Sequence, residues 1–146
     1  MMLFCMSKIF IFLIGLMWYC MVSAEPLWLK NDTNAHLFDV EIADTPEKSQ
    51  LGLMFREHLD DDKGMLFVLP QKHPLYMWMK NTYISLDMLF FDTDGKIVKI
   101  IPNTTPFSEQ ILPSEISVAG VLEVNAGIAQ KLNIQVGDYI VNDRLK

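Results

Sequence analysis

The sequence predicts a mainly β fold of the α+β class, a small antiparallel or mixed, barrel-like domain with two short helices. Two observations support this. Apolar and polar residues alternate in several short segments, as they do in half-buried strands. Helix-starting and helix-ending residues bound only two short segments. The chain has 146 residues, 51% of them hydrophobic, so we expect a single compact domain.

The first 24 residues are typical of a secretory signal peptide. One cation, Lys8, precedes an apolar run over residues 9–22, and Val22-Ser23-Ala24 has the small or aliphatic residues of a cleavage site. The run is short for a membrane span, which needs about 20 residues. We therefore expect cleavage after Ala24 and a periplasmic or secreted protein of the bacterial envelope. An N-terminal membrane anchor is the alternative.

Cysteine use and charge exclude several functional classes. Both cysteines, Cys5 and Cys20, lie within the predicted signal peptide, so the mature chain would have no disulfide, thiolate metal site or cysteine nucleophile. The formal net charge is −6 and the basic residues do not cluster, so we expect no nucleic-acid partner. We also expect no membrane partner after cleavage. A small molecule or an envelope protein is the expected partner.

The mature chain begins with residues 25–34, which we expect to lead into a single β-rich domain over residues 35–142. Residues 35–43 place apolar side chains on one face and acidic ones on the other, as in a half-buried strand. Thr45 is suited to cap a helix, Pro46 to take its first position and Glu47 to lie in its first turn. A short helix is expected to follow, as far as about residue 54.

The middle of the chain predicts more strands. Residues 65–69 form an apolar strand that we expect to end at Pro70, and the apolar segment 75–81 follows. Residues 86–101 are typical of a β-hairpin, because the Asp94-Gly95 dipeptide favours a tight primed turn.

The last part of the chain predicts a long loop, a strand and the second helix. Three prolines within residues 102–117 indicate a loop without regular structure. Residues 118–124 have strand character, and Asn125 is suited to cap a short helix over residues 126–132. A turn then precedes a final strand at residues 139–141.

Five sequence blocks occur in order and at coherent spacing. They are Gly52-Leu53-Met54-Phe55-Arg56, Gly64-Met65-Leu66-Phe67-Val68, Trp78-Met79-Lys80-Asn81-Thr82 with Leu86-Asp87, Leu122-Glu123-Val124-Asn125-Ala126-Gly127, and Val136-Gly137-Asp138. This pattern resembles an uncharacterised prokaryotic family called domain of unknown function 192, over roughly residues 35–142. The resemblance implies a small β-rich domain, often exported, and it implies no activity.

Charged residues interrupt two of the apolar segments. Strand alternation puts Asp87 on the apolar face of its hairpin, so we predict a buried or semi-buried carboxylate, and Glu123 interrupts an apolar run in the same way. A buried charge is unfavourable unless it is paired or hydrogen-bonded. The expected partners of Asp87 are Lys80, Arg56 or the amides of residues 81–85.

These charged residues have two interpretations. In the first they neutralise one another and stabilise the scaffold. In the second they converge on a cleft in which aromatic and cationic side chains bind a small anionic or carbohydrate-like ligand. The candidate ligand-binding residues are Arg56, Trp78, Lys80, Asn81, Asp87 and Glu123. We expect a binding or accessory module rather than an enzyme, with no cofactor.

Two other functions stay open. A periplasmic Cu(I)-binding protein would use thioether and imidazole ligands, here His73, Met77 and Met79. A hydrolase-like enzyme would use Asp87 and Glu123 as acid and base if the two carboxyl groups are adjacent. The sequence has no zinc motif, Gly-rich phosphate loop or serine elbow.

Overall fold

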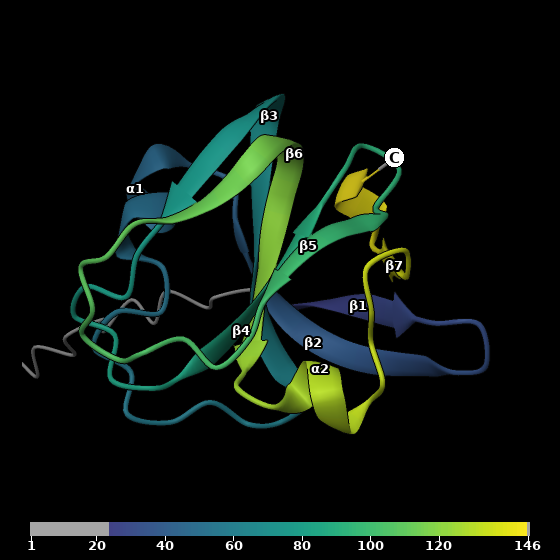
Figure 1. Cartoon of the computed structure of the whole chain (residues 1–146), viewed down its shortest axis with the longest axis horizontal. Helices are drawn as coiled ribbons and strands as arrows, with labels where there is room; N and C mark the ends of the chain where they lie inside the picture. Colours follow the sequence, from purple (N-terminus) through teal and green to yellow (C-terminus); the bar gives the residue numbers. More distant parts are fainter. Residues whose placement is uncertain (1–23, 146) are drawn as a thin grey trace, which may run out of the picture.

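The computed structural model of the protein describes residues 24–145. It confirms the predicted mainly β fold, since a seven-stranded mixed sheet is nearly closed into a barrel and carries two short helices (Figure 1). The predicted signal peptide lies outside the described residues, apart from Ala24. The strands are β1 (Ala24–Lys30), β2 (Ala35–Ala43), β3 (Lys63–Met77), β4 (Leu86–Phe91), β5 (Ile97–Ile101), β6 (Leu112–Asn125) and β7 (Tyr139–Val141). The helices are α1 (Pro46–Leu51), α2 (Ile128–Lys131) and the 3-10 helix η1 (Asp143–Leu145).

The strand order in the sheet is β5-β4-β6-β3-β2-β1-β7. Neighbouring strands pair antiparallel, except β2 and β3, which are parallel and are connected through α1. The two outermost strands approach each other, because the Ile140 amide donates to the Gly95 carbonyl at 2.7 Å and the Ile97 amide to the Asp138 carbonyl at 2.7 Å. Within residues 24–145, no helix is long and apolar enough to cross a membrane.

Strand β1 departs from the expected lead-in over residues 25–34. It pairs with β2 along its whole length and with β7 at its end, so it is a strand of the sheet itself. Leu27 and Leu29 alternate with Trp28, and both leucines are fully buried inside the barrel. The alternation in this segment is short, and the burial of its two leucines depends on strands far away in the chain.

Strands β3 and β6 form a long antiparallel ribbon that projects beyond the rest of the sheet (Figure 1). The sequence predicts an end at Pro70, but β3 continues through this proline, where the pairing register shifts between Val68 and His73. Proline is accommodated because a shifted register needs no amide hydrogen bond at that position. The partner strand begins at Leu112, so the loop covers residues 102–111 and not the 102–117 that the prolines indicate.

The β4–β5 hairpin forms at the predicted place with a different turn. Gly95 has a φ of 76°, whereas Asp94 is not among the residues with positive φ, so the turn is not of the primed type. The Asp92 carboxylate closes the turn instead, accepting from the amides of Asp94 and Lys96 at 3.0 Å each. The turn is therefore held by hydrogen bonds from the Asp92 side chain to the main chain, and it needs only one residue with positive φ.

The helices follow the predicted caps only in part. The Thr45 hydroxyl accepts from the Lys48 amide at 3.3 Å, and Pro46 begins α1, as predicted. The second helix starts after Gly127, not under an Asn125 cap. The Asn125 amide group instead donates to the Leu59 carbonyl and so connects β6 to the loop before β3.

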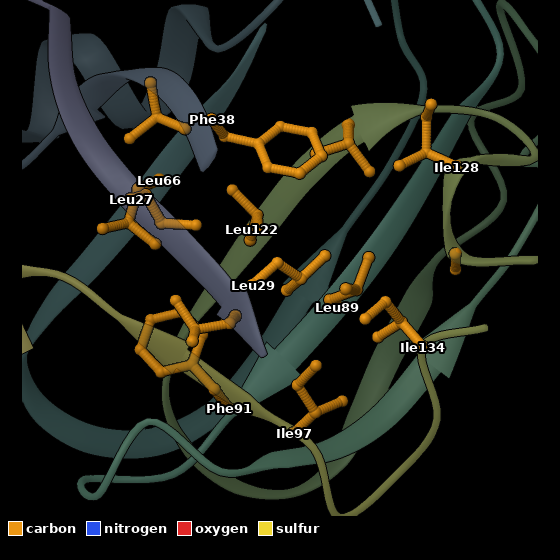
Figure 2. Close-up of a cluster of buried hydrophobic side chains, with 14 of the residues drawn as sticks. Leu27, Leu29, Phe38, Leu66, Leu89, Phe91, Ile97, Leu122, Ile128 and Ile134 are labelled. Carbon is orange, nitrogen blue, oxygen red and sulfur yellow. The ribbon is translucent and has the colours of Figure 1, made fainter. Parts of the chain in front are cut away.

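Two apolar clusters lie on opposite faces of the sheet. One fills the barrel and includes Leu66, Leu89 and Leu122 (Figure 2). The other covers the outer face of β3, β6 and β4 and includes Phe67, Phe90, Val121 and the buried Leu53 that follows α1. The outer cluster positions the candidate site, because the sheet, the segment after α1 and the segment after β3 meet there.

Candidate functional site

A pocket opens on the outer face of the sheet, between α1 and the β3–β6 ribbon. Its volume is about 280 Å³, close to the lower end of the range for small-molecule sites. Its lining is mostly apolar. The lining residues are Ser49, Gln50, Leu51, Gly52, Leu53, Met54, Phe67, Leu69, Leu75, Tyr76, Met77, Trp78, Thr82 and Glu123.

One wall of the pocket is the segment that ends α1. Gly52 turns the chain with a φ of 49°, a conformation that favours glycine. A Cβ atom at this position would lie 3.3 Å from the Phe67 ring, so the segment packs closely on β3. Leu53 is then buried in the outer cluster, and Met54 lines the pocket. The first sequence block thus forms a wall against the second.

Glu123 is buried in the floor of this pocket. It lies on β6 between Met65 of β3 and Met88 of β4, and 4% of it is exposed. No hydrogen bond or ion pair connects its carboxyl group to another residue within the described chain. Burial raises the pKa of Glu123 from 4.5 to about 8, because the apolar surroundings disfavour the charged form. In most molecules this carboxyl group is therefore protonated and uncharged at neutral pH.

The pocket mouth carries aromatic and hydroxyl groups. Tyr76 and Trp78 are 63% and 45% exposed, so parts of both rings are open to solvent. Thr82 is buried, and its hydroxyl donates to the Lys80 carbonyl at 3.1 Å, which leaves an oxygen lone pair for a second contact. A ligand in the pocket would meet apolar walls, two partly exposed rings and one buried acid.

Asp87 is fully buried, as predicted, but inside the barrel and not in the pocket. Its carboxylate accepts from the main-chain amides of Asn103 and Ala129, both at 2.9 Å. The expected partners were Lys80, Arg56 or the amides of residues 81–85, and none of these is used. Because Ala129 lies in the first turn of α2, Asp87 supplies the cap that this helix otherwise lacks.

The cations predicted for a cleft lie elsewhere. Arg56 makes a bidentate ion pair with Glu41, with 2.6 Å between Nη2 and Oε2, and the hydrogen bond raises the pKa of Arg56. Lys80 is exposed, and its ammonium group lies 3.6 Å from the Glu109 carboxylate. Asn81 has a φ of 53°, and its main-chain carbonyl accepts a hydrogen bond from the Phe55 amide at 2.8 Å. The structure thus brings Trp78 and Glu123 together and separates the other four predicted residues.

The residues named for Cu(I) do not converge. His73 is exposed on the ribbon, where its Nδ1 lies 2.8 Å from the Pro74 carbonyl oxygen. Met77 lies four residues further along the same strand, roughly 13 Å away at the usual rise per residue. Met79 is buried in the outer cluster. Residues 24–145 also contain no group of three or more His, Cys, Asp or Glu side chains that could hold a metal ion.

Sequence reasoning missed most of the pocket lining. Leu51, Met54 and Leu75 line the pocket, but their apolar character is equally well explained by a core. Their convergence depends on the parallel β2–β3 connection, which places α1 beside β3. A charged residue within an apolar run was the one signal in the sequence, and it identified Glu123.

Comparison with known proteins supports one family assignment. The model of the DUF192 family, described as Uncharacterized ACR, matches residues 27–141. The chain is similar to a proposed transcription regulator from Sinorhizobium meliloti 1021, with 40% identity, a TM-score of 0.82 and coverage of 84% of this chain and 96% of that one. It is also similar to a protein of unknown function from Novosphingobium aromaticivorans DSM 12444, with 35% identity, a TM-score of 0.79 and coverage of 81% and 84%. No curated protein matches. The chain therefore belongs to the DUF192 family, which its five sequence blocks resemble.

Proposed function

We propose that the protein binds a small, mainly apolar molecule in the pocket at Glu123, as a binding or accessory module rather than an enzyme. One observation carries the proposal. A carboxyl group without a partner in the described chain is buried in the floor of a 280 Å³ pocket that has apolar walls. The carboxyl oxygens of Glu123 are not among the fully enclosed unpaired atoms of the described residues, so a ligand in the pocket can reach them and supply the hydrogen bond that the protein does not.

The lining favours an apolar ligand over the anionic one that the sequence suggests. No Lys, Arg or His lines this pocket, so a carboxylate or phosphate would find no cation in it. Arg56 is engaged by Glu41, and Lys80 faces solvent. Carbohydrates are also less favoured, because they need many hydrogen-bonding groups and the walls supply few.

Binding is favoured over catalysis because, among the described residues that line the pocket, Glu123 has no titratable neighbour other than one tyrosine. The other titratable residue in the lining is Tyr76, at the mouth. Asp87, the second member of the acid–base pair considered for a hydrolase, is hydrogen-bonded to two amides inside the barrel. A general acid needs a partner that activates the nucleophile on the same substrate.

We place this binding module in the bacterial envelope, on the basis of the predicted signal peptide. The relative from Sinorhizobium meliloti is described as a proposed transcription regulator. In the present chain the net charge is −6 and the basic residues are dispersed, which gives nucleic acid no electrostatic basis for binding.

A fragment screen with a blocked pocket tests the proposal. Ser49 is an exposed residue of α1 that lines the pocket, so Ser49→Trp should fill the mouth without disturbing the core. Glu47→Trp on the same helix is the matched control, since Glu47 does not line the pocket. We expect apolar fragments to raise the melting temperature of the wild type and the Glu47→Trp variant but not of Ser49→Trp. Equal shifts in all three proteins, or no shift in any, would overturn the proposal.

A further inference from the structure

We propose that the pocket selects small apolar amines, whose ammonium group pairs with the carboxyl group of Glu123. The inference rests on the proposed function and names its ligand class. The geometry provides one acid at the buried end of the pocket and apolar walls around it. An apolar body with a single cationic end is complementary to this arrangement.

The surroundings of Glu123 lack what an ammonium group supplies. Met65 and Met88 flank it on the neighbouring strands, and neither side chain can donate a hydrogen bond. A carboxylate accepts several hydrogen bonds, and an ammonium group has three donors and a positive charge. An alcohol supplies one donor and no charge. An amine therefore donates more hydrogen bonds to the Glu123 carboxylate than a neutral ligand of the same shape, and it also neutralises the charge.

The charges around the pocket also distinguish a cation from an anion. The titratable residues in the lining are Glu123 and Tyr76, so an ammonium group meets no competing positive charge there. A ligand carboxylate would lie beside Glu123 without a neutralising cation. The partly exposed rings of Tyr76 and Trp78 at the mouth can attract a passing cation through their faces. The net charge of −6 adds a general attraction for cations.

Amine binding is expected to release a proton. Glu123 is mostly protonated at neutral pH, and an adjacent ammonium group favours its ionised form. When the ammonium form of the ligand binds, the O–H bond of the Glu123 carboxyl group breaks and its proton passes to the buffer. The complex then contains an ammonium–carboxylate pair. A neutral alcohol binds to the protonated acid and releases nothing.

Three probes of one shape test the inference. We would titrate the full-length protein at pH 6.5 with 2-phenylethylamine, 2-phenylethanol and phenylacetate by calorimetry, in phosphate and in Tris. Because these buffers differ in ionisation enthalpy, the difference in heat gives the number of protons released. We expect the amine to bind at least tenfold more tightly than the alcohol and to release close to one proton. Phenylacetate should bind most weakly.

Two variants assign the effect to Glu123. Glu123→Gln should remove the amine preference and the proton release while the affinity for the alcohol changes less than threefold. Glu109→Gln, at an exposed glutamate, should behave as the wild type. If Glu123→Gln does not fold, Ser49→Trp still tests the site, since it should abolish amine binding and proton release together.

The outcomes separate the inference from the proposed function. If the alcohol binds as tightly as the amine and Ser49→Trp blocks both, the amine inference is overturned while the proposed function stands. If no probe and no apolar fragment binds, both are overturned. Nα-acetyl-lysine amide carries an ammonium group on a peptide-like body and should bind at least tenfold more weakly than 2-phenylethylamine. Equal binding would assign the site to a protein side chain and overturn the inference of a free amine.

Discussion

Asp87 and Glu123 lie on adjacent strands of the sheet and face opposite sides of it. In the β4–β6 pairing, Asp87 is opposite Val124 and Met88 is opposite Glu123, so the two acids are one position out of step. Strand alternation then directs Asp87 into the barrel and Glu123 to the outer pocket. The two carboxyl groups therefore cannot act together on one substrate, and their roles are separate.

The pKa of Glu123 predicts how stability depends on pH. The unfolded chain ionises this group near 4.5 and the folded protein near 8, so the folded state binds more protons between these values. As the pH rises from 4.5 to 8, the contribution of Glu123 to the free energy of unfolding should fall by up to about 1.4 kcal/mol per pH unit. Below and above this window the contribution should be constant. Urea unfolding at pH 5, 6, 7 and 8 should show this fall in the wild type and in Glu109→Gln. Glu123→Gln should lack it, and parallel profiles for all three proteins would refute the prediction.

Asp87 is expected to contribute to stability and not to ligand binding. Asp87→Asn keeps one acceptor oxygen but turns an amino group toward the Asn103 or Ala129 amide, so one buried hydrogen bond is lost. Loss of a buried, charge-assisted hydrogen bond should lower the free energy of unfolding by about 2 kcal/mol. Denaturant unfolding measures this, with Asp94→Asn in the exposed hairpin turn as the control. A variant as stable as that control would contradict the capping role.

Arg56 and Lys80 should not affect the pocket. Arg56→Met removes the ion pair with Glu41, which is partly exposed, so the expected loss of stability is about 1 kcal/mol or less. Lys80→Met removes only a long contact on the surface. Fragment affinities of both variants should lie within a factor of two of the wild type. A tenfold loss in either variant would return that cation to the binding site.

Gly120 is expected to tolerate no side chain. A Cβ atom at this position on β6 would lie 2.0 Å from the Phe67 carbonyl oxygen and 2.5 Å from the Phe91 ring. Gly120→Ala should therefore destabilise the protein by about 3 kcal/mol, because both neighbours are in packed strands. Ser117→Ala, at an exposed position of the same strand, is the control and should change stability by less than about 0.5 kcal/mol. Equal melting temperatures for the two variants would contradict this packing.

Strand alternation and helix capping predict those elements whose structure depends on neighbouring residues in the chain. The strand over residues 35–43 and the start of α1 at Pro46 follow from alternation and capping, and both are confirmed. The last residue of β3 and the first residue of β6 were predicted wrongly. The prediction used the prolines alone, and these do not show that a partner strand continues the pairing. Sequence-local rules could not identify β1 as part of the sheet, since its pairing with β7 joins the two ends of the described chain.

The candidate site was predicted in the same uneven way. Glu123 and Trp78 were named, and both line the pocket. The sequence predicts a buried or semi-buried Asp87, and the structure confirms burial. Its partners are amides at residues 103 and 129, at distances along the chain that alternation does not reveal. Arg56 was named for its charge alone, and it pairs with Glu41 on a neighbouring surface. Charge indicates that a partner is needed, whereas tertiary structure decides which one.

The protonation of Glu123 is the most direct test of the account. The side-chain carboxyl carbons of a ¹³C-labelled glutamate sample can be followed by NMR from pH 3 to pH 10, and the Glu123 resonance is assigned as the one missing from Glu123→Gln. We expect a midpoint near 8, because the carboxyl group is buried and has no partner in the described chain. A midpoint near 4.5 would show a solvated or paired carboxylate and would contradict the central claim of an uncharged acid in an apolar pocket.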